Sequence, residues 1–222
     1  MNEEDTQPSE KPSTEAMLSA LEARVLGTLM EKQLTTPDQY PLTLNSLVIG
    51  CNQKTSREPI SNYTKGEIEN CINKLRDRKL VEVEYGSRAS RYDQRLSRQL
   101  FLEKPAQAVL TIMLLRGPQT VNELLTRTDR MTRFENAGAV QDLLNTLCQK
   151  TSPIILHLPR QAGQREDRYM HLLCGEAAAQ AASVIKTSTA SSQSEDELVA
   201  RIEELERKLA KILTHLDLDD EH

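Results

Sequence analysis

Residues 43–47 read Thr-Leu-Asn-Ser-Leu, and the same pattern returns further along the chain at residues 120–124 as Thr-Val-Asn-Glu-Leu. Similar pairs lie on either side of this one, in the same order along the chain. They are ARVL at 23–26 with QAVL at 107–110, GEI at 66–68 with GAV at 138–140, and RY at 91–92 with RY at 168–169. The offset between the two members differs slightly from pair to pair, which places insertions and deletions between elements, where loops tolerate them. A period this long predicts a duplicated small domain of about 70 residues rather than a solenoid.

Hydrophobic periodicity predicts three helices and a β-hairpin in each copy. In the first copy, apolar residues recur every three or four positions over about 15–34, 44–51 and 64–75, the spacing of helices buried on one face. Apolar and charged residues then alternate over 80–85, and a return at 91–93 completes a predicted hairpin. The second copy repeats this order, with helices over about 104–116, 120–128 and 134–150 and strands over about 154–158 and 168–173.

Three helices followed by a hairpin is the element order of a winged helix, in which the second and third helices form a helix-turn-helix and the hairpin is the wing. We therefore predict an α+β, mostly helical chain with tandem winged-helix domains at residues 15–102 and 103–175. Residues 1–14 are polar and acidic and are predicted to be disordered. Residues 176–194 are predicted to be a linker, and 195–218 a C-terminal coiled-coil helix.

The C-terminal helix carries the strongest signal for a protein partner. Its apolar residues are spaced by 4, 3, 4, 3 and 4 positions, the heptad seam of a coiled coil. The seam consists of Leu198, Ile202, Leu205, Leu209, Ile212 and Leu216. We predict a homodimer through this seam, and the alternative is that the helix folds back onto its own chain.

The charge of the chain is divided unevenly along its length. The net charge of −5 combines acidic ends, −4 over residues 1–20 and −6 over 176–222, with a body of +5 over 21–175. This division is compatible with a polyanionic partner, although many nucleic-acid-binding domains are more basic. The four cysteines form no Cys-x-x-Cys pair, and no signal peptide or membrane span is visible in the sequence. We therefore predict a cytoplasmic protein with reduced cysteines and no membrane partner.

The predicted winged helices direct attention to the third helix and the wing of each copy. The third helix can enter the major groove of DNA, while the wing contacts phosphates. The predicted DNA-binding residues are Lys65, Asn70, Asn73, Lys74, Arg88 and Arg91 in the first copy, and Arg165 and Arg168 in the second. Residues 74–98 carry a net charge of +4, and the alternative is that these side chains form ion pairs on a solvated surface. The third helix of the second copy has almost no positive charge, so the second domain is predicted to read DNA less well.

The segment at 51–59 is long and polar for the connection of a helix-turn-helix. Gln53, Lys54 and Arg57 are candidates for a recognition loop. The alternative, which we favour, is a structural loop in which Asn52 and Thr55 cap helix ends.

Nothing in the sequence predicts catalysis. There is no glycine-rich phosphate loop, no Gly-x-Ser-x-Gly and no His-Glu-x-x-His, so we predict no enzyme, no cofactor and no metal site. His157 and His171 fall on the paired strands of the second hairpin and could approach each other, but they lack a carboxylate partner in the sequence pattern.

Several stretches resemble a known family. They are TTPDQYPLTLNSL at 35–47, CNQKTSREP at 51–59, RYDQR at 91–95, LLRGPQT at 114–120 and RYMHLLCGE at 168–176. Over about residues 15–176 the chain resembles the YceH family of uncharacterised bacterial proteins. The resemblance implies a tandem winged-helix fold and implies no catalytic residues.

Two functions follow as hypotheses. The first is a dimeric tandem winged-helix protein that binds double-stranded DNA, as a transcriptional regulator. The alternative is a protein-interaction module similar to the acidic tandem winged-helix subunits of chromosome-organising complexes, because fold alone does not decide function.

Overall fold

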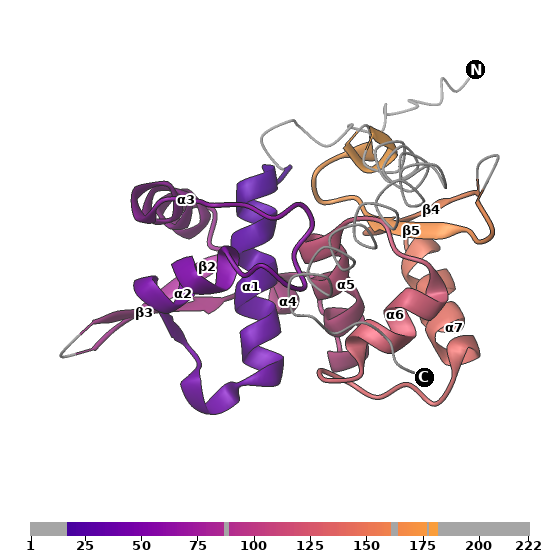
Figure 1. The fold of residues 1–222 in the computed structure, drawn as a ribbon, viewed down its shortest axis with the longest axis horizontal. Coiled ribbons are helices and arrows are strands. Elements are labelled where there is room, and N and C mark those ends of the chain that lie inside the picture. The colour runs from indigo at the N-terminus through magenta and orange to yellow at the C-terminus, as the bar shows by residue number, and fades with distance from the viewer. Residues whose placement is uncertain (1–16, 87–88, 161–163, 177, 182–222) are drawn as a thin grey trace, which may run out of the picture. The chain divides into compact units, whose positions relative to one another are not determined.

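The computed structural model describes residues 17–86, 89–160, 164–176 and 178–181. The chain divides into two compact units, residues 1–183 and residues 184–222, and the second lies wholly outside the described residues. The described part is a mixed α+β fold with two small antiparallel sheets (Figure 1). The predicted N-terminal tail, Arg88, most of the predicted linker and the predicted C-terminal helix from Leu198 to Leu216 also lie outside it. Among the described helices, none is long and apolar enough to cross a bilayer.

Each half of the described unit contains three main helices and then a hairpin, the order that the sequence predicts. The first half contains α1 (Ala20–Thr35), the short 3-10 helix η2 (Pro37–Gln39), β1 (Leu42–Thr43), α2 (Leu44–Cys51), α3 (Lys65–Asp77), β2 (Val81–Tyr85) and β3 (Ser90–Gln94). The short helix α4 (Leu96–Gln99) leads to the second half, which contains α5 (Lys104–Arg116), α6 (Val121–Thr128), α7 (Ala137–Cys148), β4 (Ile155–Leu158) and β5 (Arg168–His171).

The residues that begin the helices recur at the offsets seen in the sequence. The N-cap residues of corresponding helices are Ser19 and Glu103, Thr43 and Thr120, and Thr64 and Asn136. Within each pair, the two N-cap residues are separated by the same number of positions as the repeated sequence stretches in those two helices. Apart from Glu103, each of these side chains accepts a hydrogen bond from a backbone N–H of the first turn. The same capping chemistry therefore starts the second and third helices of both halves, whereas α5 lacks the side-chain cap of α1.

The sheets show the same correspondence. In the first half the strand order is β1-β3-β2, and Leu42 of β1 pairs with Tyr92 of β3. In the second half β4 pairs with β5, and Gln119 forms an isolated antiparallel bridge with Tyr169. Gln119 corresponds to Leu42, and Tyr169 corresponds to Tyr92. Both pairs are separated by the same number of positions as the two Arg-Tyr stretches. The duplication is thus visible in the strand register as well as in the element order.

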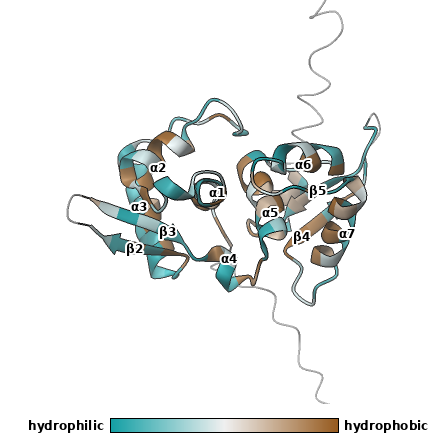
Figure 2. Cartoon of the chain, turned by 90° about the horizontal axis from the view of Figure 1, so that it is seen from below, coloured by the Kyte–Doolittle hydropathy of each residue, from teal (hydrophilic) through white to brown (hydrophobic). Residues whose placement is uncertain are grey.

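Among the described residues, the two largest clusters of the hydrophobic core meet at α1 and α5. Residues of α1, α2 and α3 dominate the first cluster, and those of α5, α6 and α7 the second. Leu110 and Leu114 of α5 nevertheless belong to the first cluster, and Leu34 of α1 packs against the second. The views in Figures 1 and 2 both show α1 and α5 side by side at the centre of the unit. The two halves are therefore joined through the packing of these helices.

Gly27 sets how closely α1 approaches α5. A Cβ at this position lies 2.9 Å from Cβ of Leu114 and 3.0 Å from Cγ of Leu115. The Leu114 Cβ is fixed to the backbone of α5, so only a shift of one helix makes room. Gly66 in the first turn of α3 is different, because a Cβ there meets nothing within 4 Å.

The two glycines give a matched pair of substitutions. We expect Gly27→Ala to lower the free energy of unfolding by about 1–3 kcal/mol through overpacking, although alanine favours helix. We expect Gly66→Ala to raise it by about 0.5 kcal/mol, because it removes backbone freedom without a clash. Urea unfolding followed by circular dichroism measures both changes, and equal effects of the two substitutions contradict the close packing at Gly27.

His171 is a buried titratable group in the second hairpin. The residue is 2% exposed, and its Nδ1 has no hydrogen-bond partner among the described residues. Burial lowers the pKa of His171 from 6.5 to about 4, because the charged form is poorly solvated there.

The lowered pKa predicts an acid-sensitive fold. Between pH 6.5 and about 4 the unfolded chain binds a proton at His171 that the folded chain does not, so stability falls as the pH falls through this window. The loss at this one residue is about 3 kcal/mol. We expect His171→Leu to remove this part of the pH dependence in urea unfolding measured at several pH values. An unchanged pH profile in the variant contradicts the prediction.

Candidate nucleic-acid interface

The outward face of α3 is polar and carries small side chains. Ile68, Cys71, Ile72 and Leu75 face the core, and Gly66, Asn70 and Asn73 lie on the opposite side and are exposed. These three residues share a face because they recur at helical spacing. A capping box between Thr64 and Glu67 starts the helix. The face therefore combines an open backbone at Gly66 with two amide side chains.

Positive charges lie on both flanks of this face. Lys65 and Lys74 are exposed and form no ion pair among the residues described. Arg76 donates to Oδ1 of Asn73 at 3.3 Å and reaches the Tyr85 hydroxyl at 3.5 Å. The predicted residues Lys65, Asn70, Asn73 and Lys74 are thus brought together on one helix surface.

Acidic side chains on α3 equal these cations in number. The backbone N–H and the hydroxyl of Thr64 both donate hydrogen bonds to the carboxylate of Glu67. These bonds, chiefly the one from the backbone, hold the pKa of Glu67 below its usual value, so this carboxylate is engaged in the helix cap. Burial, and then the nearby charge of Glu69, raises the pKa of Tyr92, which places Glu69 on the hairpin side of the helix. Asp77 is exposed at the last position of α3. The helix therefore has no net charge of its own.

The basic window at residues 74–98 is partly neutralised by ion pairs. Arg78 contacts Glu22 at 3.1 Å. Arg95 contacts Asp93 at 3.2 Å and also pairs with Glu82. The alternative of ion pairs on a solvated surface thus describes these two arginines. Glu22 lies outside the window, so its pair with Arg78 lowers the effective charge below +4, whereas Asp93 and Glu82 are already counted in that value.

The arginines of the two hairpins have a structural role that the sequence did not reveal. Arg91 Nη1 donates to the carbonyl of Pro41 at 2.7 Å, and Arg168 Nη1 donates to the carbonyl of Pro118 at 3.2 Å. Arg168 corresponds to Arg91, and Pro118 corresponds to Pro41, because each pair is separated by the same number of positions as the two Arg-Tyr stretches. The two hydrogen bonds are therefore equivalent. The two halves therefore use the same bond to tie the hairpin to the segment before the second helix.

The predicted hairpin residues differ in their availability. Arg168 also binds Glu123 at 2.7 Å and is half-buried, so the structure places it in the fold rather than on a contact surface. Arg91 and Arg165 are exposed, and Arg88 is outside the described residues. The second hairpin thus offers fewer free cations than the sequence pattern indicates.

Arg57 of the predicted recognition loop points inward. It is 2% exposed, and its guanidinium bonds Glu31 at 2.7 and 3.2 Å and the carbonyl of Gly50 at 3.0 Å. Asn52 bonds the backbone of Tyr63 in both directions at 2.8 Å. These contacts favour the structural interpretation of the loop for Arg57 and Asn52, and the burial of Arg57 leaves its guanidinium little surface for a recognition role.

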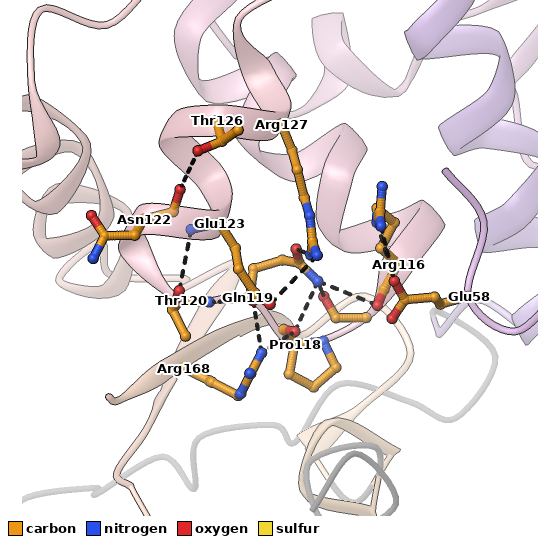
Figure 3. A network of polar contacts seen from close by, with 11 residues as sticks. Glu58, Arg116, Pro118, Gln119, Thr120, Asn122, Glu123, Thr126, Arg127 and Arg168 are labelled. Atoms are coloured by element: carbon orange, nitrogen blue, oxygen red, sulfur yellow. Dashed lines mark hydrogen bonds and ion pairs between the residues drawn. The ribbon is translucent and has the colours of Figure 1, made fainter. Parts of the chain in front are cut away.

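The loop is also fastened to the second half. The backbone N–H of Glu58 donates to the carbonyl of Leu115 at 2.9 Å, and Arg116 donates to the Glu58 carboxylate at 3.1 and 3.2 Å. Figure 3 shows this pair beside a network in which Gln119 donates to the carbonyl of Pro118 at 2.8 Å and accepts from Arg127. The loop is consequently held at both edges by charged side chains.

A cleft of about 500 Å³ opens between this loop and the second half. Gln53 and Lys54 line it from the loop, so these two predicted residues keep a surface position. The other cationic residues of the lining are Lys32, Arg116, Arg127 and Arg130. Sequence reasoning did not assemble this cluster, because its members come from distant segments in both copies of the repeat.

The corresponding surface of the second half is less suited to nucleic acid. Gly138, Asp142 and Asn145 of α7 are the repeat equivalents of Gly66, Asn70 and Asn73, and an aspartate replaces an asparagine. The helix contains no lysine or arginine. The greater suitability of the first copy for DNA stays a prediction.

The two histidines of the second hairpin do not come together. His157 pairs with Tyr169 across the hairpin, and His171 pairs with Ile155. His157 is exposed and contacts Asp167 at 2.8 Å, while His171 is buried. A carboxylate partner for His157 is therefore present, but in a surface pair.

The fold and this surface define a mixed α+β protein built from a duplicated unit of three helices and a hairpin. The family model described as "Protein of unknown function, DUF480" matches residues 18–164. A UPF0502 protein of Cellvibrio japonicus is 57% identical over 198 residues, which cover 88% of this chain and 91% of that protein. A UPF0502 protein of Ectopseudomonas mendocina is 49% identical, covering 83% and 86%. Another from Pseudomonas fluorescens is 47% identical, covering 90% and 93%.

The chain belongs to this family, the YceH or UPF0502 family of uncharacterised bacterial proteins. The resemblance seen in the sequence is thereby confirmed.

The pair of Glu31 and Arg57 predicts a further pH dependence. Burial acts to raise the pKa of Glu31, but the hydrogen bonds and charge of Arg57, with a contribution from Lys32, outweigh burial and lower the pKa below 4.5. The pair therefore stabilises the fold fully above pH 4.5, and this stabilisation is lost as the pH falls through the folded-state value.

We expect Glu31→Gln to reduce the free energy of unfolding at pH 7 by about 3 kcal/mol, because Arg57 keeps a buried charge without its partner. The difference from the original protein should shrink below pH 4.5. Glu69→Gln, at an exposed carboxylate, is the control and should change stability little. A constant effect of Glu31→Gln at all pH values contradicts the assignment.

Proposed function

We propose that each half is a winged-helix unit and that the protein binds double-stranded DNA in the cytoplasm, as a transcriptional regulator. In this proposal α2 and α3 form the helix-turn-helix, and β2 and β3 form the wing. The order of helices and hairpin in both halves supports the assignment. Its central support is the outward face of α3, where Gly66, Asn70 and Asn73 lie exposed between two lysines.

The chemistry of this face fits the major groove. An α-helix fits the width of the groove, and an asparagine side chain can bond the edge of an adenine through two hydrogen bonds. Asn70 and Asn73 are the candidates for such contacts. Lys65 and Lys74 on the flanks would contact phosphates, which set the position of the helix without reading sequence. Glu69 and Asp77 limit the attraction, so the affinity should be weak for one chain and strongly salt-dependent.

Dimerisation would compensate for weak binding by a single chain. We propose that the heptad seam from Leu198 to Leu216 pairs two chains in parallel. Two linked units bind with a much higher effective concentration for the second contact. The exposed arginines Arg91 and Arg165 would then reinforce contacts to phosphates near each hairpin.

A charge series at Gly66 tests the proposal, because side chains there face open space. We expect Gly66→Glu to weaken duplex binding by about tenfold or more, since like charges at an interface cost several kcal/mol. Gly66→Lys should strengthen binding and steepen the log–log salt slope by about 0.9 for one added phosphate contact. Gly66→Ala should bind as the original protein does. Fluorescence anisotropy with a labelled mixed-sequence duplex at low salt measures all three.

The same titration decides against the proposal in two cases. The first is the absence of duplex binding at low salt, and the second is equal binding by the Glu and Lys variants. Thermal unfolding of each variant serves as a check, and all three should be folded because the position is open.

A second candidate function is docking of a protein partner. Four large apolar side chains are exposed in the first half and its connection to the second, namely Ile49 at 69%, Ile60 at 65%, Tyr85 at 78% and Phe101 at 89%. Exposed apolar side chains of this size are typical of interaction surfaces when they form a contiguous patch. An absence of DNA binding in the Gly66 series would favour this candidate over the first.

A further inference from the structure

We propose that the cleft between the two halves binds a small organic anion that carries phosphate groups. Its walls are α1, the loop at 53–56, α5, and α6 with the segment that follows it. Its volume of about 500 Å³ lies within the range of small-molecule sites in proteins. This inference does not rest on DNA binding by α3, because none of the residues of the α3 face lines the cleft.

The lining carries a clear excess of positive charge. Five of its residues are cationic and one, Glu31, is acidic. Glu31 is engaged by Arg57 at 2.7 Å and by Lys32 at 3.3 Å, so it neutralises little of the remaining charge. Lys54 and Arg130 are exposed and form no ion pair within the described part of the chain. An anion in the cleft would therefore meet two unpaired cations.

The two arginines deeper in the cleft are held in place by carboxylates outside its lining. Arg116 directs Nε and Nη2 to Glu58, and Arg127 contacts Glu123 at 3.5 Å and Gln119 (Figure 3). A guanidinium has five N–H donors, so each arginine keeps donors for a ligand while its position stays fixed. Planar guanidinium groups fixed in this way suit the oxygens of a phosphate.

The cations are close enough to affect one another. Burial is the main cause that lowers the pKa of Arg127, and the charges of Arg116 and Arg168 lower it further, against the opposing effect of Glu123 and Glu58. Like charges held together in this way favour a bound anion, which reduces their mutual repulsion.

The remaining lining indicates an organic ligand rather than a bare ion. Ile112 and Met131, both 5% exposed, supply apolar surface. Hydroxyl groups come from Thr35, Thr36, Thr55, Ser56 and Thr126. The lining is thus mainly polar, with a smaller apolar part than most small-molecule sites have. A ligand with phosphate and hydroxyl groups matches this combination.

Isothermal titration calorimetry with ATP, pyrophosphate and adenosine tests the proposal on the full-length protein. We expect ATP and pyrophosphate to bind with one site per chain and adenosine, which lacks phosphate, to bind far more weakly. The variant Lys54→Ala/Arg130→Ala should weaken ATP binding at least tenfold. Both side chains lack ion pairs among the described residues and are exposed, so the variant should remain folded.

The control variant Lys65→Ala/Lys74→Ala removes the same charge from α3 and should leave ATP binding unchanged. Gly66→Glu should also bind ATP normally, which separates this proposal from DNA binding by α3. The proposal is overturned by three outcomes: no saturable ATP binding below about 1 mM, equal weakening in the control variant, or a loss of duplex binding in Lys54→Ala/Arg130→Ala without any effect on ATP. The last outcome would make the cleft part of a nucleic-acid surface.

Discussion

The close packing of α1 against α5 is the contact on which the rest of the described structure depends. Each half is a unit of about 70 residues, a size at which a single core is marginally stable. Gly27 allows the two helices to approach until its backbone lies against Leu114 and Leu115. Leu110 and Leu114 of α5 then complete the core of the first half, and Leu34 of α1 covers part of the second. Each half thus gains buried apolar surface that it could not supply alone.

This packing also fixes the loop between α2 and α3. Two buried arginines tie the loop to α1: Arg24 of α1 donates to the carbonyls of Cys51 and Pro59, and Arg57 of the loop pairs with Glu31 of α1. Glu58 binds the second half through Leu115 and Arg116. A loop with charged anchors on both edges has little freedom, because releasing any one of them leaves a charge or carbonyl poorly solvated. The cleft therefore has a wall of defined shape.

The sequence was sufficient for the duplication, because a repeat is a comparison of the chain with itself. The offsets between the repeated stretches reappear as the spacing of the N-cap residues and of the paired strands. The roles of individual arginines could not be predicted in this way. Arg91 and Arg57 look alike in the sequence, yet Arg91 is exposed and Arg57 is 2% exposed. What distinguishes them is the position of carbonyl groups and of Glu31, which only the folded chain brings near.

The cleft follows from the duplication itself. Lys32 and Arg116 occupy the same position counted from the N-cap residues of α1 and α5. Both lie in the last turn of their helix, where the helix dipole favours a cation. Packing the two equivalent helices together brings both ends, and both cations, to one cleft. Gln53 and Arg130 also correspond to each other, because they are separated by the same number of positions as the N-cap residues of α2 and α6. Both residues line the cleft. The cationic end of one helix is thus an ordinary helix end in a single copy, and it becomes half of a charged cleft when two copies are joined. The faces of α3 and α7, in contrast, do not contribute to the cleft, and their residues differ between the copies.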